Sequence, residues 1–248
     1  PPVSSSATTG PDHAHTYEGK KPYAEARALR EDEIPRILED YAKAARNAIE
    51  AGFDGVQIHA ANGYLIDQFL RDNTNLRDDD YGGSPENRIR FMREVTERVV
   101  AEIGAGRTAI RLSPNGESQG ADDSNPEAVF VPAAKVLNDL GIAFLELREI
   151  AADGTFGSTD VPKLSPKIRQ VFTGPLVLNQ DYTADSAQSD LDKGVADAIA
   201  WGRLFIANPD LVERFRTGAP LNAPNPRTFY TPGPEGYTDY PALETAGV

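Results

Sequence analysis

Between residues 29 and 216, apolar positions alternate between helical spacing and short continuous runs. Residues 31–51 carry apolar side chains three or four positions apart and stop at Gly52, which predicts an amphipathic helix. The apolar run that follows predicts a strand, and the same pair of signals then recurs along the chain. The predicted strands are residues 53–60, 108–112, 142–147, 176–178 and 195–201.

Helix starts carry their own signature, a small polar residue that is often followed by proline. This signature predicts helices that open at Ser84, Asn125, Ser165, Thr183 and Asn208. Residues 1–28 show no period and predict a lead-in loop, and residues 217–248 predict a loop-rich tail. We therefore expect one domain, with βα units over residues 29–216.

Strict alternation of strand and helix predicts an α/β fold with parallel strands and helical crossovers. Five strands would suffice for an open, doubly wound sheet, whereas a closed β/α barrel needs eight. The periodicity leaves both architectures open. In either one, ligands bind at the carboxyl ends of the strands, so the residues just after each strand are the informative ones.

Composition narrows the possible functions. The 248 residues include no cysteine, which excludes disulfides, thiolate metal sites and cysteine nucleophiles. The net charge of −13 disfavours nucleic acid as a partner. No apolar run approaches the roughly 20 residues that span a bilayer. We expect a cytoplasmic protein without a metal site, and the acidic run 78–80 is interpreted as a solvated loop. The opening Pro1-Pro2 and the single methionine, Met92, suggest that a further segment lies upstream.

Polar residues follow the first predicted strand. His59 and Asn62 can both donate hydrogen bonds to one oxygen, and Tyr64 offers a phenolic proton nearby. Taken alone, this short pattern fits a structural histidine at a strand end better than a site. It becomes a catalytic candidate only in a wider context.

Two arginines are candidates for binding an anionic ligand. Arg111 lies within an apolar strand, where a cation needs either a ligand or an ion pair, and Glu146 on the next strand is an equally good partner. Gly202 and Arg203 follow the last strand and suit a phosphate. Phosphates in β/α barrels usually bind after strands seven and eight, which would place the missing strands upstream.

Longer blocks of sequence resemble the Old Yellow Enzyme family, which includes oxophytodienoate reductases and pentaerythritol tetranitrate reductase. The blocks occur in the same order as in that family and cover nearly the whole chain. They are residues 53–65, 68–70, 73–75, 80–88, 110–114, 202–203, 207–211, 229–230 and 235–241.

The resemblance implies the last five βα units of a (β/α)8 barrel that binds FMN and takes hydride from NADPH or NADH. The implied substrate is a small activated alkene, an α,β-unsaturated carbonyl or nitro compound. His59 and Asn62 would bind its oxygen. Hydride would come from flavin N5, and Tyr64 would supply the proton.

The same resemblance implies a set of cofactor-binding residues. Arg111 would face the N1/O2 edge of the flavin, Gly202 and Arg203 would hold its phosphate, and Tyr230 would cover its dimethylbenzene ring. Gln180 and Asp181 occupy the phosphate loop, where the family usually has small residues. An aspartate is an uncomfortable neighbour for a phosphate, so this loop departs from the pattern.

Five strands cannot close a barrel, so we expect the first three from a complementary N-terminal polypeptide segment. Related flavin barrels that carry an iron–sulfur cluster are excluded by the absence of cysteine. The alternatives to an ene-reductase are a non-catalytic flavin or small-molecule binder, and a fragment that is inactive without its complement.

Overall fold

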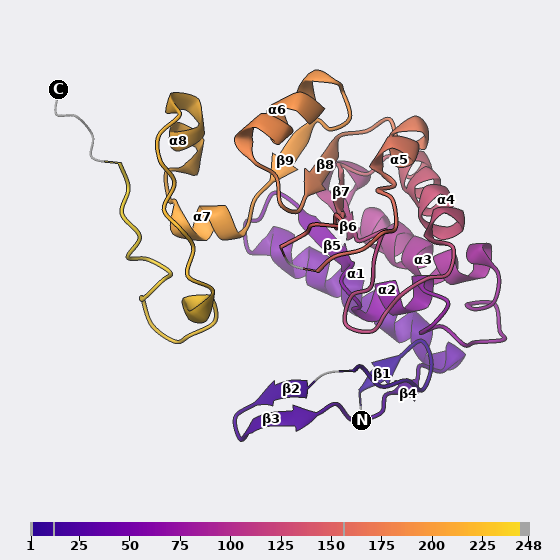
Figure 1. Cartoon of the computed structure of the whole chain (residues 1–248). Helices are drawn as coiled ribbons and strands as arrows, with labels where there is room; N and C mark the ends of the chain where they lie inside the picture. The colour runs from indigo at the N-terminus through magenta and orange to yellow at the C-terminus, as the bar shows by residue number, and fades with distance from the viewer. Residues whose placement is uncertain (1, 12, 156, 244–248) are drawn as a thin grey trace.

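A computed structural model describes residues 2–11, 13–155 and 157–243 (Figure 1). Its centre is a five-stranded parallel sheet whose spatial order follows the sequence order. A doubly wound sheet would reverse its strand order, whereas a barrel adds each strand beside the last. The chain therefore forms five consecutive βα units of a (β/α)8 barrel. The strands are β5 (Val56–Ala60), β6 (Thr108–Leu112), β7 (Leu145–Arg148), β8 (Leu176–Asn179) and β9 (Ala198–Ala200).

Helices connect consecutive strands and cover one face of this sheet (Figure 1). The helices are α1 (Ile34–Glu50), α2 (Leu65–Leu70), α3 (Pro85–Ile103), α4 (Pro126–Asp139), α5 (Ser165–Val171), α6 (Ala184–Asp192), α7 (Arg203–Ala207) and α8 (Leu211–Thr217). Neighbours in the helical layer pack on one another, α1 against α3, α3 against α4 and α4 against α5. The two short helices α7 and α8 follow the last strand.

The two faces of the sheet differ in polarity because side chains alternate along each strand. The face under the helices is apolar, and a cross-strand row of Ala60, Leu112, Leu147 and Leu178 is at most 2% exposed. The other face, which would form the inside of a closed barrel, carries polar and charged side chains. The site therefore lies on this second face and at the carboxyl ends of the strands.

Two of the predicted helix caps are confirmed, one predicted cap is wrong, and one predicted helix start is wrong. Ser84 and Thr183 each accept a hydrogen bond from a backbone N–H in the first turn. α5 opens at Ser165 as predicted, but Ser165 is its first helical residue and not its cap, because the buried carboxylate of Glu149 accepts the N–H groups of Leu164 and Ser165. Asn208 opens no helix, since it follows α7 and precedes α8.

The lead-in is more ordered than a loop, so that part of the prediction is wrong. β1 (Val3–Ser4) pairs with β4 (Arg27–Ala28), and β2 (His13–Thr16) forms a hairpin with β3 (Gly19–Pro22). β3 is exposed along its whole length, so no apolar alternation marked the hairpin. Short 3-10 turns lie at Glu31–Glu33, Ala105–Arg107 and Pro226–Thr228. In the part of the chain that the structure describes, no helix is long and apolar enough to cross a membrane.

The tail forms an arm that leaves the body after α7 (Figure 1). Arg214 organises it: this side chain is only 5% exposed and donates to Asp210 Oδ1 at 2.7 Å. It also donates to the carbonyl oxygens of Pro220 and Pro241. One buried guanidinium therefore ties α8 to two points of the tail, which the loop-like composition did not indicate.

Candidate active site

A row of charged side chains crosses the polar face of the sheet. His59, Arg111 and Glu146 are register neighbours on β5, β6 and β7. His59 is exposed, whereas the side chains of Arg111 and Glu146 are 24% and 12% exposed. An imidazole and a guanidinium therefore lie next to each other, facing the interior that a closed barrel would enclose.

The turn after β5 carries Asn62 and Gly63 in the left-handed region, with φ values of 57° and 76°. Two backbone N–H groups fix this turn: that of Asn62 donates to Ser113 Oγ at 2.8 Å, and that of Gly63 donates to Asp67 Oδ2 at 2.8 Å. Asp67 is fully buried in an ion pair of 2.9 Å with Arg71, which is also fully buried. The strained turn is thus held from beneath by a buried charge pair.

His59 and Tyr64 lie in contact at the two ends of this turn. Their ring centroids are 5.1 Å apart in an edge-on arrangement, and Tyr64 remains 55% exposed. Partial burial, and then the positive charge of Arg111, lower the pKa of His59 below its ordinary value. The imidazole is therefore neutral at pH 7, and one of its nitrogens carries a proton that it can donate.

Asn62, the third predicted catalytic residue, has its carboxamide oriented by a neighbour. Arg148 Nη1 donates to Asn62 Oδ1 at 3.3 Å. The oxygen of the Asn62 carboxamide is therefore occupied, and its NH₂ group can donate to another acceptor. The structure thus brings His59 and Tyr64 together, with Asn62 in the turn between them.

Arg111 combines the two alternatives that its position in a strand suggested. Its Nε lies 3.1 Å from Glu146 Oε1, which is the expected ion pair, and its Nη2 donates to Asn179 Oδ1 at 2.9 Å. The buried Nε–H is nonetheless not aligned for a hydrogen bond. Part of the donor capacity of Arg111 therefore remains available to a ligand.

A cavity of about 400 Å³ opens beside Arg111. Five of the six predicted cofactor-binding residues line it, namely Arg111, Gln180, Asp181, Gly202 and Arg203. Tyr230 does not line this cavity: it is 97% exposed on the arm. A single hollow at the carboxyl end of the sheet therefore gathers residues from β6 and from the segments that follow β8 and β9.

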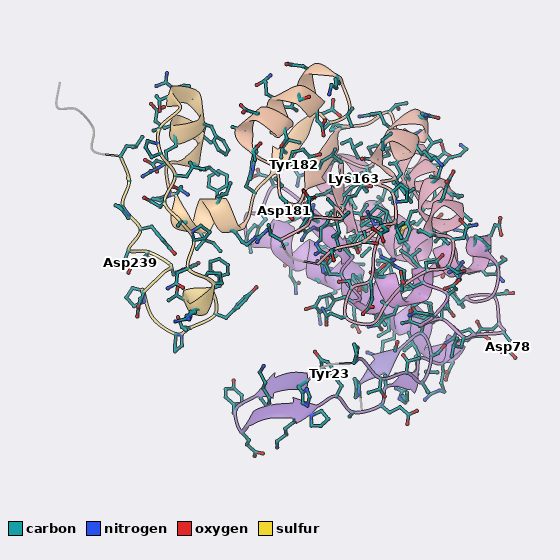
Figure 2. The ribbon with its side chains drawn as sticks, viewed as in Figure 1. Tyr23, Asp78, Lys163, Asp181, Tyr182 and Asp239 are labelled. Carbon is teal, nitrogen blue, oxygen red and sulfur yellow. The ribbon has the colours of Figure 1, made fainter. Side chains whose placement is uncertain are left out.

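Asp181 and Arg203 both line this cavity and form an ion pair with each other. Figure 2 shows Asp181 near the start of α7. The Arg203 guanidinium donates to Asp181 and, at 2.6 Å, to Thr155 Oγ1. Partial burial would raise the pKa of Asp181, but hydrogen bonds from Thr155 and the charge of Arg203 outweigh it and leave the pKa below its usual value. The carboxylate of Asp181 is therefore anionic and forms an ion pair with the guanidinium of Arg203.

Several residues at this end of the sheet escaped prediction from sequence. Asn179 bridges Arg111 and the carbonyl of Ala200, Arg148 contacts Asn62, and Thr155 contacts Asp181. The period of a strand could have found Arg148, which lies two positions after Glu146 and so shares its face. Thr155 lies in an irregular loop with no such signal. Within the described ranges, no group of acidic or histidine side chains is arranged to hold a metal ion.

The sequence matches one protein family and several relatives within it. Residues 2–222 match the NADH:flavin oxidoreductase / NADH oxidase family. The chain is 48% identical to putative 12-oxophytodienoate reductase 10 of Oryza sativa subsp. japonica, over 90% of its own length and 72% of that relative. It is 44% identical to 12-oxophytodienoate reductase 2 of Arabidopsis thaliana, of which it spans 59%.

Solved structures agree with these relatives. An old yellow enzyme homologue from Zymomonas mobilis is 67% identical with a TM-score of 0.96, over 98% of this chain and 68% of that one. Morphinone reductase in complex with tetrahydroNAD is 45% identical with a TM-score of 0.89, over 98% of this chain and 67% of that one. The chain thus corresponds to about two thirds of these proteins.

Proposed function

Because the chain belongs to the NADH:flavin oxidoreductase / NADH oxidase family of FMN-dependent oxidoreductases, we propose that it acts as an ene-reductase. It would use NADPH or NADH to reduce the C=C bond of an α,β-unsaturated carbonyl or nitro compound. The observation that carries this proposal is the contact of His59 with Tyr64 on the sheet face that also bears Arg111. These acid–base and oxygen-binding groups thereby lie beside Arg111, which lines the cavity together with Arg203.

The residues around the cavity fit FMN. Arg111 keeps a buried Nε–H without a hydrogen-bond acceptor, which suits an electron-rich edge of a flavin. A Cβ added to Gly202 would meet nothing within 4 Å, so a phosphate can approach this backbone beside Arg203. Asp181 fits least well, because its carboxylate occupies the guanidinium that a phosphate would need. When bound, FMN would supply the hydride that reduces the alkene.

The substrate would be held through its oxygen. Neutral His59 and the amide of Asn62 would both donate to the carbonyl or nitro oxygen and stabilise the negative charge that develops there. The phenol of Tyr64 would then give its proton to the α-carbon. These roles use an acid and two donors from one short segment, residues 59–64, so their relative positions depend on the buried groups that support the turn within it.

The hydride donor and the location of the protein are parts of the same proposal. Morphinone reductase, solved with tetrahydroNAD, supports a nicotinamide as the donor, and we keep both NADPH and NADH. We place the enzyme in the cytoplasm. Activity would be tested by purifying the protein, recording its flavin absorbance, and following NADPH oxidation with and without cyclohexenone. Flavin without turnover would favour a non-catalytic binder, and neither would favour an inactive fragment.

We further propose that β5 and β9 pair with strands from a complementary polypeptide segment. Both are edge strands of the described sheet, and a closed barrel has eight strands without edges. Tyr230, which is exposed on the arm, would cover the dimethylbenzene ring of the flavin in this proposal. When the complementary segment is present, native mass spectrometry is expected to show a complex that contains this chain, that segment and bound flavin. A stable, flavin-loaded single chain of this sequence would contradict this part of the proposal.

Replacing Asp181 by asparagine is expected to tighten FMN binding by about threefold to tenfold, because it removes a partly exposed negative charge worth about 1 kcal/mol. Asparagine also tolerates the left-handed backbone found here, where φ is 56°. Titration of FMN and riboflavin, followed by flavin fluorescence, measures the effect. Riboflavin has no phosphate and should bind with unchanged affinity.

The matched control for this experiment is Asp185→Asn, an exposed aspartate in the first turn of α6. It lies outside the cavity lining and should leave the affinity for both flavins unchanged. Equal tightening of FMN and riboflavin by Asp181→Asn would rule out a phosphate at Arg203.

A further inference from the structure

We propose that Arg148 is a positioning residue for the substrate, which locks the carboxamide of Asn62 with its amide group turned toward the substrate oxygen. The same guanidinium connects Asn62, through Gln180, to Asp181 and Arg203, where the flavin phosphate would bind; we call this part of the cavity the phosphate end. The inference rests on the proposed ene-reductase function and adds to it a residue outside the predicted His59, Asn62 and Tyr64 set.

The contacts of Arg148 join two segments that are distant in sequence. It is the last residue of β7 and is 7% exposed. Its Nη1 donates to Asn62 Oδ1 at 3.3 Å in the turn after β5, 86 residues away. Its Nε donates to Gln180 Oε1 at 3.2 Å in the segment after β8. One rigid guanidinium thus lies between the turn that carries Asn62 and the cavity residue Gln180.

The chemistry of this contact sets the direction of the amide. A guanidinium has donors and no acceptor, so it can only bind the oxygen end of a carboxamide. If the Asn62 amide turned over, its NH₂ group would face a cation, and both donors would lose their acceptor. A hydroxyl group in place of Arg148 would accept either orientation. The arginine therefore holds Asn62 in the one rotamer that offers a donor to the substrate.

The second arm continues toward the phosphate end. Gln180 accepts from Arg148 and donates through Nε2 to Asp181 Oδ2 at 2.9 Å. Asp181 in turn accepts from Arg203 and Thr155. A chain of hydrogen bonds thereby runs from the substrate anchor to the cation at the phosphate end, and Arg148 is the link that belongs to neither end.

Arg148 is also a buried cation beside the place where negative charge develops. Burial, followed by the nearby charge of Arg111, lowers the pKa of Arg148 from its ordinary high value. Asp181 and Asp67 act in the opposite direction. A guanidinium stays protonated at pH 7 in this setting, so it remains a charged donor to Asn62 Oδ1 and polarises the carboxamide whose NH₂ group would bind the substrate.

The test is a double-mutant cycle between Arg148→Met and Asn62→Ala in the flavin-loaded, full-length protein. The dissociation constant of cyclohexanone, a saturated carbonyl probe, is measured by perturbation of the flavin spectrum, together with anaerobic cyclohexenone reduction. Arg148→Met should weaken cyclohexanone binding and slow reduction by about tenfold in the wild-type background. In the Asn62→Ala background it should change either by less than about twofold, because the group through which it acts is gone.

Two further variants keep the result interpretable. Arg148→Lys retains the charge but not the planar guanidinium. Its cyclohexanone affinity and its rate of cyclohexenone reduction should therefore lie between those of the wild type and of Arg148→Met. Arg169→Met removes an arginine of α5 that pairs with Asp197 and donates to the carbonyl oxygens of Phe172 and Gly174. Arg169 lies outside the cavity lining, so this variant should change neither readout. Thermal unfolding of each variant identifies any that fail to fold, and Arg148→Lys then provides the test.

Equal losses from Arg148→Met in both backgrounds would overturn the inference, since a merely structural role predicts additivity. An unchanged cyclohexanone affinity would overturn it as well. Failure of the proposed function looks different: the wild-type protein itself would then bind no cyclohexanone and reduce no cyclohexenone. The two hypotheses therefore fail by separate results.

Discussion

Replacing Tyr64 by phenylalanine is expected to slow cyclohexenone reduction by about 10²- to 10⁴-fold, the range that a general acid contributes. Only the hydroxyl is lost, so the ring keeps its edge-on contact with His59. Reduction of the flavin by NADPH needs no proton donor at this position and should stay within about twofold of wild type. Anaerobic stopped-flow absorbance of the flavin measures the two half-reactions separately.

The comparison variant for this experiment is Tyr17→Phe in the hairpin turn, an exposed tyrosine of the lead-in. It should leave both half-reactions unchanged. Equal losses in the two half-reactions of Tyr64→Phe would contradict a role as proton donor and would favour a role in the shape of the pocket.

Replacing Asp67 by alanine is expected to lower the free energy of unfolding by about 3–5 kcal/mol, the usual result of breaking a buried ion pair. Asp67 and Arg71 are both fully buried, and the variant would leave a guanidinium in the interior without its counter-charge. Arg71 would keep its carbonyl acceptors Ser113 and Gly116, which cannot neutralise it. Urea denaturation followed by circular dichroism measures the loss.

A second consequence follows from the turn that Asp67 supports. Without its carboxylate, the N–H of Gly63 loses its acceptor, so the turn that carries Asn62 and Tyr64 should loosen. Asp67→Asn, which keeps an oxygen at this position, is expected to lose less stability than Asp67→Ala. Asp40→Ala breaks the exposed Arg36–Asp40 pair on α1 and should change stability little. Similar losses from the buried and the exposed pair would contradict this interpretation.

Local signals in the sequence predicted much of the barrel. The strand at 108–112 was predicted to the residue, because an apolar run between a helix end and a proline leaves little freedom. Thr183 was predicted as a cap because its side chain needs only the first turn of its own helix. The choice between an open sheet and a barrel could not be made from periodicity, since it depends on which strands pair.

Long-range pairing limited the prediction of the site in the same way. Residues next to a strand end, such as His59 and Arg203, could be proposed from position alone. The contact of Arg148 with Asn62 depends on the register of three strands, β5, β6 and β7, which no local pattern encodes. The buried pair of Asp67 and Arg71 has helical spacing, but many exposed pairs have the same spacing. Only the fold distinguishes a buried pair from an exposed one.

A crystal structure of the protein grown with FMN and cyclohexanone tests most directly whether these side chains surround one cofactor. We expect the flavin phosphate at Gly202 and Arg203, the ring beside Arg111, and the cyclohexanone oxygen within hydrogen-bond distance of His59 and Asn62. The proposed site would be contradicted by a flavin bound elsewhere, or by side chains of His59, Asn62 and Tyr64 that point away from the flavin ring.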